Sequence, residues 1–237
     1  MLPCLLLLSI LPSAAKQSHA CGARRAFLDL GANDGQSLRW FQSNKMAHAA
    51  TPYTSVVAFE MNPAFASVLR GLLRGMAGGE LVAAAAWTTQ GTMKANMQLP
   101  GSRTATKHGL VYNMTASALI TSDGMPLNRH QGRRKHAGAT PYEASLTVPT
   151  IDLANWLADR FCPADHVEIK MDIEGAEFEV LEHLLRSGRA SLVDSISIEW
   201  HTSKRGQKNT RIQLQRRQQT IIAALQRAKV NVVEWKL

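Results

Sequence analysis

The feature that most constrains the fold is a short apolar run that stops at a glycine. Residues 26–30 read Ala-Phe-Leu-Asp-Leu, and the turn that follows contains Gly31 and Gly35. An apolar run of this length before a glycine-bounded turn is typical of a buried strand in a parallel sheet. Residues 37–45 then have the pattern of a helix. The sequence therefore predicts a strand, a tight turn and a helix, in that order.

Strand and helix patterns keep alternating along the rest of the chain. The predicted strands span residues 55–60, 80–87, 166–172, 193–200 and 230–235, and residues 92–98 are predicted to pair back as a hairpin strand. The predicted helices begin at Asn62-Pro63 and span 153–161 after an Asp152 cap, 176–187 before Gly188, and 210–228. This alternation indicates one α/β domain with a largely parallel sheet and right-handed crossovers.

Residues 1–20 differ in composition from the rest of the chain. A leucine-rich apolar run is followed by small residues, and cleavage after Ala15 or Ala20 would fit. This pattern is typical of a secretory signal peptide and is too short to span a bilayer. We expect a targeting segment, then a folded domain at 21–237 in the secretory pathway lumen or outside the cell, with no transmembrane anchor. Organelle import is the alternative, since no acid precedes Asp29.

The cysteines suggest a disulfide. Removal of a signal peptide would discard Cys4 and leave Cys21 and Cys162. Cys21 lies eight residues before Asp29 and Cys162 ten before Asp172, and both aspartates end predicted strands. Neighbouring parallel strands lie about 4.8 Å apart, within the range that a disulfide bridges. We therefore hypothesise a Cys21–Cys162 disulfide, with two unrelated thiols as the alternative.

The chain has a net charge of +9, and part of the excess is concentrated in two segments. One lies in a polar stretch of about residues 100–146, interpreted as a basic loop insert, which also holds the sequon beginning at Asn113. The basic residues are Arg129, His130, Arg133, Arg134, Lys135 and His136 in the insert, and Lys204, Arg205, Lys208, Arg211, Arg216 and Arg217 near the C-terminus. Such groups attract anions, although a solvated basic face is the more frequent explanation.

The turn after the first strand has the chemistry to bind a zwitterionic nucleoside. Asp29 lies near the end of the strand, Gly31 and Gly35 let a ligand approach the backbone, and the helix N-terminus offers free amides to a carboxylate. S-adenosylmethionine (SAM) carries an ammonium and a carboxylate, so this turn suits its methionine end. The turn lacks the G-x-G-x-x-G pattern that binds a pyrophosphate, which disfavours a dehydrogenase. Glu60 ends the second strand, where an acid can accept hydrogen bonds from ribose hydroxyls.

A second group of acids follows the predicted strand 166–172. Asp172 and Glu174 come at its carboxyl end, which places them beside the ligand crevice of an α/β sheet. Lys170 is either the partner of a neighbouring acid or a residue that contacts substrate. Glu177 falls in the first turn of a helix, where its charge favours the helix dipole, so we interpret it as structural.

Together these motifs resemble the FkbM family of SAM-dependent methyltransferases. The matching segments are 27–35, 57–63, 84–91, 148–153 and 169–177, the last with the pattern Lys-x-Asp-x-Glu-Gly-x-Glu. The resemblance implies a Rossmann-like, mostly parallel sheet of seven strands, the class I SAM methyltransferase fold. It implies SAM-binding roles for Asp29, Gly31, Gly35 and Glu60, to which we add the candidate cofactor contacts Asn33, Met61, Ala86 and Trp87. Met61 stands where the family usually has proline.

Members of that family methylate hydroxyls of sugars and natural products, so a group that accepts the hydroxyl proton is expected. We expect Asp172 to be the base or orienting group. The further catalytic candidates are Lys170, Glu174, and two residues at the end of strand 193–200, Glu199 and His201. Two acids and a histidine could instead hold a divalent cation that lowers the pKa of the acceptor, although no residue is assigned as a metal ligand.

We therefore expect an O-methyltransferase that uses SAM and acts on a glycan or another hydroxylated small molecule. The basic insert would suit an anionic acceptor. One alternative is RNA ribose methylation, in which basic loops would grip phosphates. Few aromatic residues lie among the basic clusters, so nucleic acid is the less favoured partner. Another alternative is a catalytically inactive binding module that keeps the SAM fold.

Overall fold

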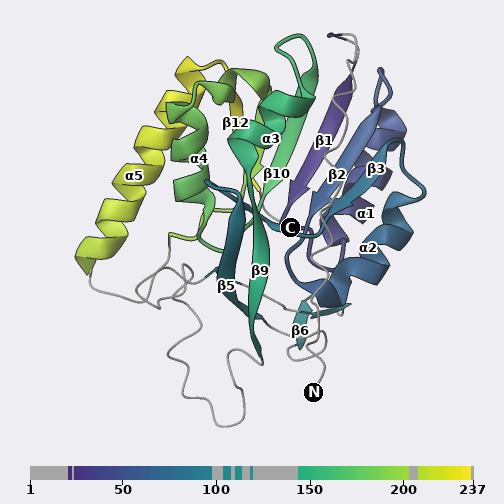
Figure 1. Cartoon of the computed structure of the whole chain (residues 1–237), viewed down its shortest axis with the longest axis horizontal. Coiled ribbons are helices and arrows are strands. Elements are labelled where there is room, and N and C mark those ends of the chain that lie inside the picture. The colour runs from purple at the N-terminus through teal and green to yellow at the C-terminus, as the bar shows by residue number, and fades with distance from the viewer. Residues whose placement is uncertain are drawn as a thin grey trace, which may run out of the picture.

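In the computed structural model, the chain folds around a six-stranded parallel sheet (Figure 1). Its strands, in spatial order, are β12 (Asn231–Glu234), β11 (Ser195–Ile198), β10 (His166–Met171), β1 (Arg25–Leu30), β2 (Ser55–Phe59) and β3 (Gly79–Val82). The chain runs outward from β1 to β3, then returns and runs outward from β10 to β12. The topological switch point therefore lies between β1 and β10. The predicted α/β fold is confirmed, with six strands among the described residues instead of seven.

The structure describes residues 21–22, 24–97, 104–107, 110–113, 118–119, 144–202 and 208–235. The predictions for the targeting segment at 1–20, for the remainder of the sequon at 114–115, and for the basic residues 129–136 and 204–205 lie outside them.

Helices cover both faces of the main sheet. One face carries α1 (Gln36–Asn44) and α2 (Ala66–Leu73), and the other carries α3 (Leu153–Arg160), α4 (Glu177–Arg186) and α5 (Lys208–Arg227) (Figure 1). Short 3-10 turns occur at η1 (Met46–His48), η2 (Pro63–Phe65) and η4 (Arg189–Leu192). Two layers of helices on one parallel sheet are the arrangement that the strand and helix alternation predicted.

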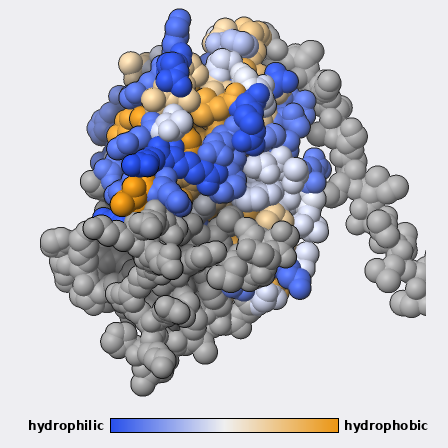
Figure 2. Space-filling view, turned by 90° about the vertical axis from the view of Figure 1, so that its left-hand side faces the viewer, coloured by the Kyte–Doolittle hydropathy of each residue, from blue (hydrophilic) through white to orange (hydrophobic). Residues whose placement is uncertain are grey.

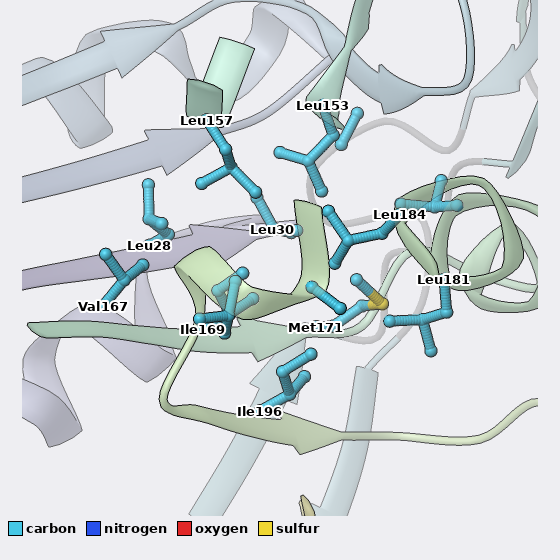
Figure 3. Close-up of a cluster of buried hydrophobic side chains, with 14 of the residues drawn as sticks. Leu28, Leu30, Leu153, Leu157, Val167, Ile169, Met171, Leu181, Leu184 and Ile196 are labelled. Carbon is cyan, nitrogen blue, oxygen red and sulfur yellow. The ribbon is translucent and has the colours of Figure 1, made fainter. Parts of the chain in front are cut away.

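The alternation of side chains along β1 divides the core between the two faces. Phe27 packs with α1 and α2, whereas Leu28 and Leu30 pack with α3 and α4. Figure 3 shows the second cluster, in which leucines of α3 and α4 meet apolar side chains of β1, β10 and β11. Its labelled members are Leu28, Leu30, Leu153, Leu157, Val167, Ile169, Met171, Leu181, Leu184 and Ile196.

A second sheet lies near the carboxyl ends of the main strands, in the lower part of Figure 1. Its spatial order is β4 (Ala85–Trp87), β9 (Ala144–Asp152), β5 (Gly91–Met97) and β8 (Ala118–Leu119). A separate antiparallel hairpin consists of β6 (Thr104–Lys107) and β7 (Leu110–Asn113). Part of the predicted loop insert at about 100–146 therefore forms strands.

Two predictions about these strands are wrong. The predicted strand 80–87 is divided, because β3 pairs with β2 in the main sheet while β4 joins the second sheet. The predicted hairpin does not form, because β9 lies between β4 and β5. The nine-residue β9 pairs with β4 in parallel and with β5 in antiparallel orientation. Strand β9, which follows the insert in the sequence, therefore pairs with β5 in place of the preceding strand β4.

The predicted helix boundaries agree with the structure to within a few residues. Asp152 caps α3 by accepting a hydrogen bond from the Asn155 amide at 3.1 Å. Asn62 accepts one from the Ala64 amide at the start of η2, which leads into α2. Gly188 follows α4 with φ of 70°, a left-handed conformation that glycine adopts without strain.

A disulfide joins Cys21 to Cys162, as hypothesised, with 5.8 Å between the two Cα atoms. It lies at the amino ends of β1 and β10. Next to it, the Asp165 carboxylate accepts hydrogen bonds from the backbone amides of Gly22, Arg24 and Cys162 and pairs with the Arg24 guanidinium at 2.8 Å. The start of the described chain is therefore fastened at the end of the sheet opposite the strand carboxyl ends.

The surface of the described residues is largely hydrophilic on the face that carries α5, with apolar side chains between (Figure 2). One predicted basic residue of that helix, Arg217, forms ion pairs within the fold, with Glu179 at 3.0 Å and Glu182 at 2.6 Å. Among the described residues, no helix combines the length and the hydropathy needed to cross a bilayer.

Candidate functional site

Two adjoining pockets lie at the carboxyl ends of the strands, at the switch point between β1 and β10. Gly31, Asn33 and Asp172 line both. The first pocket is also lined by Phe59, Glu60, Met61, Phe65, Ala84, Ala85, Ala86, Leu119, Ile173, Glu174 and Ala176. The second is also lined by Ala32, Asp34, Gln36, Ser37, Lys170, Glu199 and Trp235. A ligand that fills both must pass Asp172.

The bend after β1 brings two backbone segments together. Gly31 has φ of 80°, and a Cβ atom there would lie 1.9 Å from the carbonyl oxygen of Asp172. Only glycine fits this contact, which joins the loop after β1 to the loop after β10. Gly35, with φ of 87°, is the N-cap of α1, and a Cβ there would lie 2.4 Å from the side chain of Leu72. Gly35 lines neither pocket, so its position serves the helix and its contact with α2.

Glu60 is positioned directly after β2 to face the first pocket. Its two carboxylate oxygens accept hydrogen bonds from the backbone amides of Asn33 and Asn62, each at 2.7 Å. Each oxygen keeps a further lone pair for a ligand hydroxyl. Burial raises the pKa of Glu60 to about 7, against the opposing effect of the two amides. The acid that was predicted to bind ribose therefore lies at a pocket wall.

The other walls of the first pocket are apolar. Met61 and Ala86, two predicted cofactor contacts, line it, whereas the predicted Trp87 does not. Phe65 and Leu119 were missed by the sequence reasoning. Phe65 lies on a helical apolar stripe, a pattern that core residues share, and Leu119 belongs to a two-residue strand inside a polar segment that offers no pattern.

Asp29 faces the protein interior instead of a pocket. It is fully buried, accepts a hydrogen bond from the Ser37 hydroxyl, and lies 3.3 Å from the Lys170 Nζ atom. Lys170 donates to the Gly31 carbonyl oxygen at 3.0 Å and lies 3.6 Å from an Asp172 oxygen. Burial alone would lower the pKa of Lys170, but the charges of Asp29 and Asp172 outweigh it and raise that pKa. Of the two roles predicted for Lys170, the geometry favours the partner of neighbouring acids.

His201 belongs to a network with three carboxylates and lines neither pocket. Its Nδ1 atom lies 2.8 Å from a Glu177 oxygen that also accepts hydrogen bonds from the amides of Ile173 and Gly175. Its Nε2 atom lies 3.4 Å from Glu174 and 3.8 Å from Asp172. Burial opposes protonation, but the hydrogen bond to Glu177 and the surrounding charges raise the pKa of His201 to about 10. His201 is therefore an imidazolium at neutral pH. Glu177 is fully buried and lines neither pocket, which agrees with its interpretation as a structural residue.

The residues that could hold a divalent cation do come together. Ligand atoms of Asp172, Glu174 and His201 all lie within 4.8 Å of one another. Carboxylate oxygens and an imidazole nitrogen suit a divalent cation. Protonated His201, however, has no lone pair to offer, so a cation would have to displace its proton. The donor set fits such an ion only in part.

Glu199 lies beside Asp172 at the second pocket, as predicted from the adjacent strand ends. The Glu199 amide donates to the Met171 carbonyl oxygen at 2.9 Å, which aligns the two loops. Its carboxylate forms no hydrogen bond or ion pair with another described residue. Partial desolvation and the charge of Asp172 raise the pKa of Glu199. Trp235, which follows β12 and was not predicted, completes this wall.

Comparison with known proteins agrees with these motifs. The sequence profile of the methyltransferase FkbM domain matches residues 29–228, which contain every pocket residue named above except Trp235. No curated protein and no solved structure matches the chain. The profile covers most of the chain, so this protein belongs to the FkbM methyltransferase family.

Proposed function

We propose that the protein transfers the methyl group of SAM to a hydroxyl oxygen of a glycan or another hydroxylated small molecule. Membership of a methyltransferase family supports the transfer. The observation that carries the cofactor assignment is the pair of pockets that meet at Gly31, Asn33 and Asp172. SAM is an extended molecule with a nucleoside at one end and an amino acid at the other, which matches one largely apolar and one polar pocket.

The first pocket suits the adenosine end. Glu60 can accept hydrogen bonds from ribose hydroxyls, and the apolar walls at Met61, Phe65 and Leu119 suit a purine ring. The second pocket suits the charged end. The described residues that line it include three acids, Asp34, Asp172 and Glu199, and one cation, Lys170. This excess of carboxylates favours a ligand with an ammonium and a sulfonium.

Asp172 lines both pockets, so it would contact the cofactor where its two ends join. SAM supplies an electrophilic methyl carbon, and transfer needs the acceptor oxygen in line behind it. Asp172 would orient the acceptor hydroxyl and take up its proton as the new bond forms. Lys170 and His201 flank its two oxygens at 3.6 and 3.8 Å and hold the carboxylate in place. Glu199 beside it is a second group able to accept that proton.

The acceptor is proposed to present a neutral hydroxyl at the reacting end, because the described pocket walls are rich in carboxylates. The basic insert residues that suggested an anionic acceptor lie outside the described residues, and Arg217 of the second basic segment forms ion pairs within the fold. RNA ribose methylation remains the second candidate acceptor reaction, and an inactive SAM-binding module the third.

We also propose that the protein works in the secretory pathway or outside the cell. The Cys21–Cys162 disulfide supports this proposal, since stable disulfides form mainly in oxidising compartments.

Calorimetry with S-adenosylhomocysteine, the demethylated product, tests the cofactor assignment. We expect binding by the wild-type chain and marked weakening in Glu60→Gln. Glu80→Gln, which removes an acid paired with Arg160 outside both pockets, should bind normally. Absence of binding by the wild-type chain would refute the proposal.

A labelled-methyl screen over glycan, lipid and RNA fractions tests the acceptor. Label in glycan or in a hydroxylated metabolite supports the proposal, and label in RNA alone replaces it with the second candidate. On the acceptor found, Asp172→Asn should lose at least a hundredfold in kcat. Full activity of that variant in the presence of a chelator would exclude Asp172 both as a base and as a cation ligand.

A further inference from the structure

One wall of the first pocket comes from the second sheet. Leu119 in β8 is 3% exposed and lines the pocket together with Glu60, Met61 and Phe65, which follow β2. β8 reaches this place through β5, with Leu119 paired to Ala95. Ala95, Met97 and Val148 are buried in the same apolar cluster, and Met61, which follows β2 of the main sheet, packs against it.

The position of Leu119 differs in origin from that of the pocket residues that follow β2. Glu60, Met61 and Phe65 follow β2 and are set by the main sheet. Leu119 depends on the succession of strands β4, β9, β5 and β8. The pocket is therefore assembled from two sheets, with the ribose-facing acid on one and an apolar side chain on the other.

We propose, as an inference that rests on the proposed function, that Leu119 sets the purine selectivity of the cofactor pocket. A purine is flat and largely apolar on its faces, and it gains most by displacing water from apolar side chains on both sides. Leu119 would provide an apolar contact whose position is set outside the main sheet. The second sheet is then a part of the cofactor site in addition to any role it has toward the acceptor.

Leu146 provides a matched control. It pairs with the same Ala95 from the other side of β5, but it is 39% exposed and lines neither pocket. Leu119→Ala should weaken binding of S-adenosylhomocysteine and of 5′-methylthioadenosine, which lacks the amino-acid end, by the same factor of about ten. Leu146→Ala should bind both like the wild type. Leu119→Met, which nearly conserves volume, should stay within about twofold.

A gain of binding separates this role from a loss of folding. Analogues of 5′-methylthioadenosine enlarged on the purine ring at N6, C2 or C8 should be rejected by the wild type, and at least one should bind Leu119→Ala more tightly. Equal affinities of Leu119→Ala and Leu146→Ala for all ligands, with no gain for any analogue, would overturn the inference and leave the proposed function standing. If the wild type bound neither natural ligand, the proposed function would fail, and this inference with it.

Discussion

The buried Lys170–Asp29 pair offers a sharp test of the electrostatics described above. Lys170 is 3% exposed, Asp29 is fully buried, and their charged atoms lie 3.3 Å apart. At an effective dielectric constant of about 20, two unit charges at that distance attract by about 5 kcal/mol. Lys170→Met removes the cation and leaves Asp29 with only the Ser37 hydroxyl as a donor. We expect a loss of about 3–5 kcal/mol in the free energy of unfolding.

A second lysine in the chain provides the control. Lys45 lies 3.5 Å from Glu168, but its side chain is 51% exposed, and Glu168 keeps Arg25 and Tyr53 as partners. Lys45→Met should therefore cost about 0–1 kcal/mol.

Urea unfolding at pH 7.5, followed by circular dichroism, measures both costs. The double variant Asp29→Asn with Lys170→Met should recover much of the loss, because no unpaired charge remains buried. If Lys170→Met cost no more than Lys45→Met, or if the double variant were no more stable than the single one, the assignment of Lys170 as a buried structural cation would be wrong.

Three further predictions concern pH and the disulfide. Because the pKa of His201 is raised to about 10, its stabilising effect should be complete below pH 6.5 and lost as pH rises to 10. The difference in free energy of unfolding between wild type and His201→Gln, measured with urea, should then shrink over that range. A difference that stayed constant would contradict the raised pKa of His201. Because burial raises the pKa of Glu60 to about 7, affinity for S-adenosylhomocysteine by calorimetry should rise about tenfold from pH 6 to 8, and the rise should vanish in Glu60→Gln. Replacing both cysteines of the disulfide by serine opens a loop of 141 residues and should cost about 4–5 kcal/mol, with pocket affinity unchanged at 20 °C.

Local patterns predicted the parts of the fold that depend on local interactions. Apolar runs found the main strands, and Asp152 and Gly188 marked helix ends because capping involves residues within one turn. Glu60 and Asp172 were predicted as site residues because the carboxyl ends of parallel strands border the ligand crevice, and both line a pocket. The register Asp29↔Lys170 follows from the pairing of β1 with β10, so their ion pair could have been inferred once the strands were aligned.

The remaining features depend on partners that are distant in sequence. Val82 to Ala86 is uniformly small and apolar, so nothing in the segment shows where the chain leaves one sheet for another. The partner of β5 arrives from beyond the insert, which local hairpin rules cannot anticipate. Leu119 becomes a pocket residue through three successive strand pairings, and Trp235 through its place after the edge strand β12.

The close contact between Gly31 and the Asp172 carbonyl oxygen has a consequence for the order of events in turnover. No side chain separates the two loops, so neither can shift without pushing the other. A molecule that binds at the bend after β1 therefore fixes the position of Asp172, after β10, before a second molecule binds. We expect the methyl donor to bind first and the acceptor to meet Asp172 already in its final position.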